Sequence, residues 1–338
     1  VELSPFMSSL QHGFKGNASP KDLETLFQLQ YLYFTHPRQD EEIFEKGIDN
    51  LKNQIKHLSA NPQMVFYDSL YQTINMHSLR VIVIPTEKQI NSIRRSDLYF
   101  TYKKLYEHAA GFKVFIVGNV DTSHLKVLVS QYLASVPTGK GPLNWEDRTT
   151  SFPKGENRVE VMKGSEPQSR VALVMKGKYR FNDHNNLIVN AFVQSLNIEL
   201  RERVREEESG TYGIYVSPYL SKYPKPEYSL MLGFGCAPEN VNRLVKPVFA
   251  VMVKMKKEGP DALTLKKVKE TFLRSYESDV RKNNYWLNKL IDLDFEGLPI
   301  NTSTTYEAKV NAISVGDIRK AAKKYITEKH YVLGVLIP

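Results

Sequence analysis

The sequence predicts an α+β fold built from two duplicated units, each an antiparallel sheet with helices packed on one face. Three observations support this class. With 338 residues, the chain exceeds the usual size of a single domain, so two hydrophobic cores are expected. In the second half, predicted strands cluster before helices. A helical pattern at 96–106, followed by a strand pattern, also recurs 220 residues later at 316–326.

Composition and charge limit the possible functions before any motif is considered. Hydrophobic residues make up 41% of the chain and charged residues 25%, which is typical of a folded protein. Cys236 is the only cysteine, which excludes an intrachain disulfide and a thiolate metal cluster. A formal net charge of +9 would attract acidic partners or nucleic acid. Apolar runs such as 248–253 are far too short for a membrane span, and none is predicted.

The first half is predicted to be mostly helical. A strand-like stretch at 7–15 comes directly at the start of the chain, so we expect this unit to be truncated at its N-terminus. Ser19 and Pro20 then favour a helix start, because a hydroxyl caps free amides and proline suits the first turn. The β-branched run at 113–120 is predicted to be a buried strand. Helices are expected near 22–32, 40–58, 62–73, 96–105 and 121–132.

The second half combines strands and longer helices. An apolar stripe with a four-residue step, from Ile188 to Val204, predicts a helix with one buried face. Two alternating stretches at 212–216 and 228–234 are expected to form a hairpin. Further strands are expected at 158–162, 170–175 and 331–336, and helices at 186–205, 239–257, 260–280, 284–293 and 314–327.

A break in these patterns separates the two predicted units. Gly139, Gly141 and Pro142 lie together in a stretch rich in turn-forming residues, which predicts a linker at 138–157. The units are therefore expected at 1–137 and 158–338. If the offset of 220 residues reflects a duplication, the first unit lacks the counterparts of residues 158–217. We expect a truncated unit followed by a complete one.

Three stretches, in order along the chain, carry a resemblance to a known family. They are residues 16–38, which open with Gly-Asn-Ala-Ser before a helix, residues 102–121, and residues 200–212, which run from Leu-Arg-Glu-Arg to Gly-Thr-Tyr. Together they resemble the C-terminal half of M16 zinc metallopeptidases of the pitrilysin and insulin-degrading-enzyme type, in the long bacterial branch. The resemblance implies a third-domain type unit at 1–137 and an inactive, fourth-domain type unit at 158–338.

The zinc-binding motif of that family is missing here. M16 enzymes hold zinc with an inverted motif, His-x-x-Glu-His, in which the two histidines lie one helical turn apart. The eight histidines of this chain are never closer than sixteen residues, so no two share a helix face at ligand spacing. We therefore expect no metal site in this chain. The resemblance implies that zinc is bound by an N-terminal half of the same polypeptide, and that this chain is inactive alone.

Arg205 and Tyr212 are the candidate site residues. Arg205 is predicted in the last turn of its helix, Gly210 permits a reversal, and Tyr212 begins the next strand, so both side chains can emerge at one edge of the sheet. In the resembled family, an arginine and a tyrosine at this spacing serve the substrate and the transition state. The alternative is that Arg205 pairs with the acidic run at 206–208 and that Tyr212 merely packs.

Other residues compete for or extend this site. Arg201 and Arg203 are alternatives for the arginine role, although only Arg205 stands seven residues before the tyrosine, which is the family spacing. Tyr215 is a possible cavity-lining residue, as are Tyr219 and Tyr223, although tyrosines on strands more often pack against neighbours.

The sequence leaves several functions open. The first is the substrate-enclosing half of a zinc endopeptidase that cleaves peptides or small unfolded proteins in a closed chamber. The second is a non-catalytic relative that acts as a scaffold or processing partner. The third is a basic nucleic-acid-binding module, which the absence of any nucleic-acid motif disfavours. The resemblance to exported bacterial proteases implies a periplasmic location, with the cytoplasm as the alternative.

Overall fold

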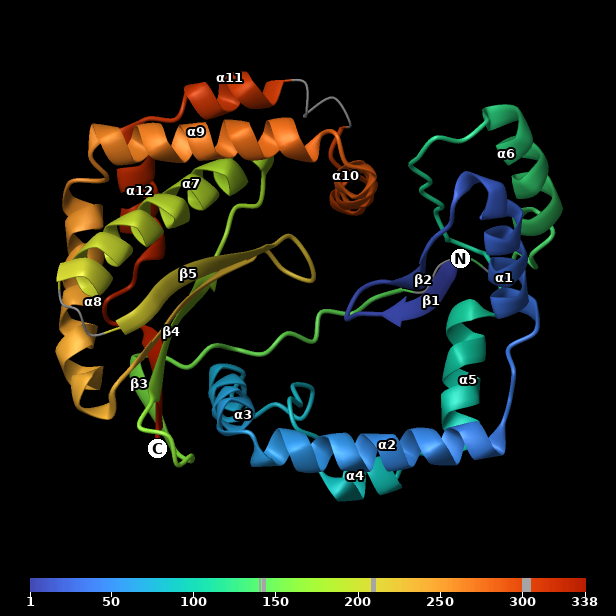
Figure 1. The fold of residues 1–338 in the computed structure, drawn as a ribbon, viewed down its shortest axis with the longest axis horizontal. Coiled ribbons are helices and arrows are strands. Elements are labelled where there is room, and N and C mark those ends of the chain that lie inside the picture. The colour runs from blue at the N-terminus through green and yellow to red at the C-terminus, as the bar shows by residue number, and fades with distance from the viewer. Residues whose placement is uncertain (140, 142–143, 208–210, 300–304) are drawn as a thin grey trace. The chain divides into compact units, whose positions relative to one another are not determined.

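The computed structural model describes residues 1–338 apart from 140, 142–143, 208–210 and 300–304 (Figure 1). The side chains of residues 205–207 and 212 also lie outside the described part, although their backbone lies within it. The chain forms two compact units. The first contains Val1–Gln54, Thr86–Asp147 and Val280–Phe295, and the second contains Ile55–Pro85, Arg148–Asp279 and Glu296–Pro338.

The first unit combines a hairpin with helices. Its two strands pair antiparallel from Glu2 opposite Asn17 to Met7 opposite His12. Leu23, Phe27 and Leu128 form a small core in which the first helix packs against a later helical stretch. The elements of this unit are β1 Glu2–Met7, β2 His12–Asn17, η1 Pro20–Asp22, α1 Leu23–Thr35, α4 Glu87–Asn91, α5 Arg95–Tyr106, α6 Thr122–Leu128, the π-helical turn η2 Val129–Leu133 and α10 Asn283–Glu296, with most of α2 Glu41–Ala60.

One element predicted for this unit is wrong. Residues 113–120 form no strand, and Val114 and Ile116 expose 51% and 38% of their surface. Within the described part of the chain, the segment pairs with neither strand of the hairpin. A β-branched run favours an extended backbone, but a strand forms only where a neighbouring strand accepts its hydrogen bonds.

The second unit is built on a five-stranded sheet of order β3-β7-β4-β6-β5. Neighbouring strands are antiparallel except β3 and β7, which run parallel with Glu156 opposite Tyr331. The α+β class is confirmed, with a mixed sheet in place of the expected antiparallel one. The strands are β3 Glu156–Met162, β4 Ser169–Lys178, β5 Thr211–Ser221, β6 Glu227–Cys236 and β7 Tyr331–Ile337.

Helices cover one face of this sheet (Figure 1). The predicted stripe of α7 is buried as expected: Phe192, Leu196 and Leu200 are completely inaccessible. They share a core with alternate residues of the strands, such as Leu173 and Leu232. The helices of this core are α7 Asp183–Leu200, α8 Val241–Lys257, α9 Ala262–Asp279 and α12 Val315–Tyr325, and the short α11 Tyr306–Asn311 packs on α9.

A further helix, α3 Pro62–Ile74, packs on the opposite face of the same sheet. Phe66 and Leu70 are fully buried against Ala172 and Val332. The sequence places this helix before residue 137, yet in space it belongs to the second compact unit. Units that are compact in space need not coincide with units that arose by duplication of the sequence. The partition into 1–137, 138–157 and 158–338 therefore stays a prediction. In the described ranges, no helix has the length and hydropathy that crossing a bilayer requires.

Candidate functional site

The backbones of Arg205 and Tyr212 lie on two elements that contact each other. Arg205 belongs to η3 Arg201–Glu207, a π-helical segment that directly continues α7, and Tyr212 is the second residue of β5. Single π-helical turns occur frequently at functional sites. The side chains of Arg205 and Tyr212 lie outside the described residues, as do residues 208–210. Their shared role therefore stays a prediction.

Tyr212 occupies a β-bulge. Thr211 pairs with Cys236 and Gly213 pairs with Gly235, so Tyr212 is an extra residue on β5 without its own partner on β6. The hydroxyl of Thr211 donates to the carbonyl oxygen of Gly235 at 2.7 Å and accepts from the amide of Gly213 at 3.2 Å. These contacts hold both sides of the bulge. A bulge re-aims a side chain relative to the regular pleat, and bulges are common beside active sites.

The end of α7 is anchored by an ion pair. Glu199 is buried, and its Oε2 accepts from Nζ of Lys254 on α8 at 2.9 Å. This hydrogen bond raises the pKa of Lys254 above its ordinary value. Beyond it, Val204 is fully buried while Arg201 and Arg203, the competing arginines, are exposed. The described part of the segment therefore exposes charged side chains of both signs and buries Val204 beneath them.

Tyr215 lies on the sheet face opposite α7. Ile214 and Val216 point into the core beneath α7, so the residue between them points the other way. Its ring covers Gly233, where an added Cβ would lie 2.9 Å from the hydroxyl oxygen. Tyr215 remains 44% exposed, and its hydroxyl forms a hydrogen bond with Tyr67 of α3. Burial, followed by this hydrogen bond, raises the pKa of Tyr215.

Two neighbours of Tyr215 were missed by sequence reasoning. Tyr67 is separated from it by more than 140 residues, and no local pattern signals that contact. Arg170 interacts electrostatically with Tyr215 and could have been found, since alternation around the buried Val171 places it on the same face. Tyr219 and Tyr223, the two other tyrosines predicted near the site, lie farther along the hairpin than Tyr215. Tyr219 is 68% exposed, and Tyr223 follows β5 with the Lys222 ammonium 5.2 Å from its ring centroid.

The described residues do not fit a zinc ion. Among them, no three histidine, cysteine or acidic side chains come together at ligand distance. Cys236 is buried, and this burial raises the pKa of its thiol to about 11, which keeps it protonated at neutral pH. A thiolate ligand or nucleophile is therefore not supplied at this position.

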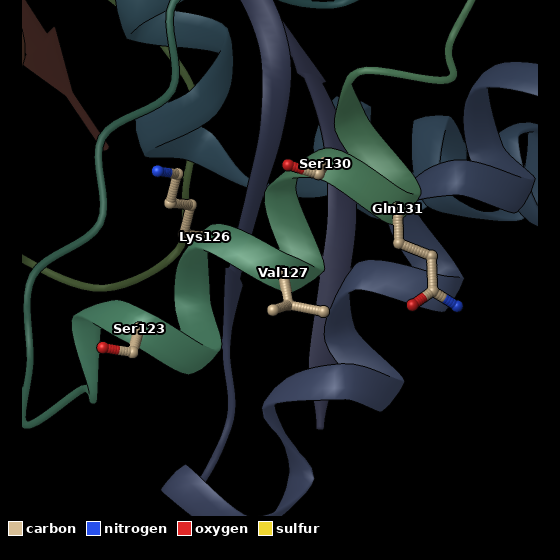
Figure 2. A pocket seen from close by; sticks show the side chains of 5 residues that line it. All are labelled: Ser123, Lys126, Val127, Ser130 and Gln131. Carbon is tan, nitrogen blue, oxygen red and sulfur yellow. The ribbon is translucent and has the colours of Figure 1, made fainter.

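A surface hollow of about 480 Å³ lies on the first unit. Figure 2 shows that its lining side chains come from one helical stretch, α6 and η2, and spread along it instead of converging on a point. Val127 at its centre is 58% exposed. A ligand site normally encloses its ligand between several elements, so this hollow is a helix face. Its lining residues are Ser123, Lys126, Val127, Ser130 and Gln131.

The chain is similar to known zinc proteases along its whole length. It is 25% identical to the probable zinc protease PqqL of Escherichia coli over 343 aligned positions, which cover 100% of this chain and 36% of that protein. The crystal structure of the periplasmic protease PqqL from Escherichia coli superposes with a TM-score of 0.83 at 23% identity, covering 100% of this chain and 37% of that one. The ferredoxin protease FusC in complex with Arabidopsis ferredoxin gives a TM-score of 0.83 at 15% identity, with coverage of 100% and 37%.

The chain thus spans about a third of the length of these relatives. The family described as the Peptidase M16 inactive domain matches residues 92–272, just over half of the chain. This range includes η3, the bulge at Tyr212 and the helices α7 and α8 that support them. The resemblance found in the sequence is confirmed, and the chain belongs to the M16 peptidase inactive-domain family.

Proposed function

We infer that this chain is the substrate-enclosing, non-metal-binding part of a zinc-dependent endopeptidase that cleaves peptides or small unfolded proteins. The observation that carries this inference is the family match over η3 and the bulged start of β5, where Arg205 and Tyr212 stand at the family spacing. The described residues do not fit zinc, so the metal would be held by an N-terminal part of the same polypeptide. On its own, this chain would be inactive.

The two site residues would have different roles. The guanidinium of Arg205 can donate hydrogen bonds to a substrate carbonyl in a fixed geometry and keeps its charge at any physiological pH. The hydroxyl of Tyr212 can donate to the carbonyl oxygen that becomes negative in the tetrahedral intermediate. Tyr215, half-exposed on the sheet face that α3 partly covers, is a candidate for contacts with the peptide away from the reacting bond.

The relatives support a proposal for location and substrate class. The Escherichia coli protein is described as a periplasmic protease, which supports an exported location for this chain, with the cytoplasm as the alternative. The FusC structure contains a ferredoxin, so small proteins are a reasonable substrate class to test beside peptides. A non-catalytic scaffold remains the competing function, because nothing in this chain itself requires peptide cleavage.

The complete polypeptide decides between the two functions. We expect it to carry a His-x-x-Glu-His motif and to cleave a quenched fluorescent peptide, with activity lost in a chelator and restored by zinc. The isolated chain should show neither tight stoichiometric zinc nor cleavage. A complete polypeptide that lacks the motif and leaves peptides intact would support the scaffold instead.

A further inference from the structure

Asn197, on α7, forms two hydrogen bonds with a single residue of β5. Its Nδ2 donates to the carbonyl oxygen of Val216 at 2.9 Å, and its Oδ1 accepts from the amide of Val216 at 2.6 Å. In an antiparallel strand, the N–H and C=O of one residue point to the same side. Since β5 is at the edge of the sheet, this side faces away from β6. Asn197 thus binds Val216 as a neighbouring strand would.

The next residue that faces outward along that edge also offers no backbone N–H to an added strand. Residues two apart point their backbone groups to the same side, so Pro218 follows Val216 along the edge of β5. Proline has no N–H, and edge strands commonly use it to prevent further pairing. This part of β5 is therefore fixed to α7 and closed to the addition of another strand. We call the two hydrogen bonds the Asn197 clamp.

The clamp lies on the two continuous elements that carry the site residues. Arg205 is eight residues beyond Asn197, along α7 and the π-helical η3 that continues it. Tyr212 is four residues before Val216, which corresponds to about 13 Å at the rise of a strand. Since η3 and β5 contact each other, the clamp and the bulge belong to one packed pair of elements.

We propose that Asn197 is a positioning residue of the site, which acts on the reaction through β5 by holding the Tyr212 bulge in register with η3. The inference rests on the proposed function of Tyr212. A carboxamide is suited to this role because it supplies one donor and one acceptor in one plane. Aspartate has the same shape but, when ionised, has no donor for the carbonyl oxygen of Val216. Strand β5 would then keep the hydrogen bond from the amide of Val216, but the carboxylate would repel the carbonyl oxygen of Val216.

The chain offers a matched control on the same helix. Asn190 is exposed, and its Nδ2 donates to the carbonyl oxygen of Asn186, within α7 itself. Asn190→Asp makes the same chemical change as Asn197→Asp without touching β5. Both variants add one negative charge to α7, and only Asn197→Asp alters the clamp.

The test uses the complete polypeptide and a quenched fluorescent peptide. Turnover and the Michaelis constant are measured for Asn197→Asp, Asn197→Ala, Asn190→Asp and Tyr212→Phe, and for Tyr212→Phe combined with each Asn197 variant. Circular dichroism melting identifies the variants that keep the parental fold. If Asn197 acts through Tyr212, its effect must shrink once the tyrosine hydroxyl is gone, because coupled sites are not additive.

We expect each folded Asn197 variant to lower kcat by about tenfold with KM changed less than about twofold, and to lower it less than about twofold in the Tyr212→Phe background. Asn190→Asp should match the parent. Equal losses in both backgrounds, or no loss while Tyr212→Phe slows turnover, would overturn the positioning role and leave the proposed function intact. Parental turnover in Tyr212→Phe would instead refute the proposed role of Tyr212, and the inference about Asn197 with it.

Discussion

Phe66 lies directly over Gly334, so close that a Cβ on the glycine would be 2.9 Å from the phenyl ring. Because Phe66 is fully buried and its ring is held by the surrounding core, the ring has little room to move away. The contact joins α3 to β7, an interior strand of the sheet. It shows that the second face of the sheet is a packed interface for this helix.

Gly334→Ala should therefore destabilise the second unit. Overpacking a filled core costs about 1–3 kcal/mol, and the cost should appear as a lower midpoint in urea unfolding. Gly47→Ala is the matched control, since Gly47 is exposed in α2 with nothing within 4 Å of an added Cβ. That change should stabilise the chain by about 0.5–1 kcal/mol. Equal midpoints for the two variants would mean that α3 does not pack on β7.

Tyr212→Phe in the complete enzyme should lower turnover far more than it weakens peptide binding. Removing one hydrogen-bond donor to the developing oxyanion typically costs about 2.7–4 kcal/mol of activation free energy. The measurement is steady-state kinetics with a peptide substrate, beside a melting curve that should match the parent. Unchanged kinetics, or an unfolded variant, would assign Tyr212 a structural role.

Arg205→Ala should raise the Michaelis constant as well as lower turnover, because a substrate carbonyl loses a charged donor whose hydrogen bond forms in the ground state and strengthens in the transition state. Arg201→Ala is a fitting control, because Arg201 is exposed on the same segment and does not have the family spacing. If Arg201→Ala has the larger effect on KM, the arginine role belongs to Arg201.

The capping box of α12, formed by Ser314 and Asp317, should make the free energy of unfolding depend on pH. The hydroxyl of Ser314 accepts from the amide of Asp317 at 3.2 Å and donates to its carboxylate at 2.6 Å. This hydrogen bond is the main reason why the pKa of Asp317 is lowered. Because the pKa is lower in the folded state, the ionised carboxylate stabilises the fold at pH values above its pKa in the unfolded chain, near 3.9. This stabilisation is lost as the pH falls through the pKa of the folded state.

Ser314→Ala should accordingly cost about 1 kcal/mol at neutral pH. The difference from the parent should start to shrink below about pH 4, where Asp317 is protonated in the unfolded chain, and should vanish as pH falls through the lowered pKa of the folded state. Urea unfolding at several pH values measures both effects. Ser123→Ala, an exposed position in α6, should stay within about 0.5 kcal/mol throughout. If the loss of stability caused by Ser314→Ala grows as the pH falls, the hydrogen bond from Ser314 is not what lowers the pKa of Asp317.

Binding to nucleic acid should be weak and sensitive to salt. A net charge of +9 attracts phosphates, and such binding is lost with rising ionic strength because it depends on the release of counterions. Fluorescence anisotropy with duplex and single-stranded DNA at two salt concentrations measures this. Sequence-selective binding that survives physiological salt would favour the nucleic-acid module over the peptidase.

Local periodicity was enough for much of the fold. The four-residue step from Ile188 to Val204 predicted the buried face of α7, and the alternating stretches around Tyr215 and Leu230 predicted the hairpin of β5 and β6. The failure at 113–120 has a physical cause, since whether an extended run becomes a strand depends on a partner that composition does not reveal.

Sequence reasoning reached candidate site residues only where they are close in sequence. Arg205 and Tyr212 were selected from the family resemblance and its spacing, and their role stays a prediction. The clamp was not predicted, because asparagine inside a helix signals only a modest loss of helix propensity. Its partner Val216 is nineteen residues away and looks like any other core residue. Tyr67 was missed for the same reason, since α3 reaches the sheet through tertiary packing alone.

The parallel pair of β3 and β7 also bears on how the second unit is made. Glu156 and Tyr331 are 175 residues apart, and β7 lies between β3 and β4 in the sheet. During synthesis, β3 and β4 have no strand between them until residues 331–337 leave the ribosome. The sheet must then close by a long-range step, and such steps are slow. Until then, the apolar surfaces of α7 and α3 lack part of their cover, which is the interval in which a chaperone would protect this chain from aggregation.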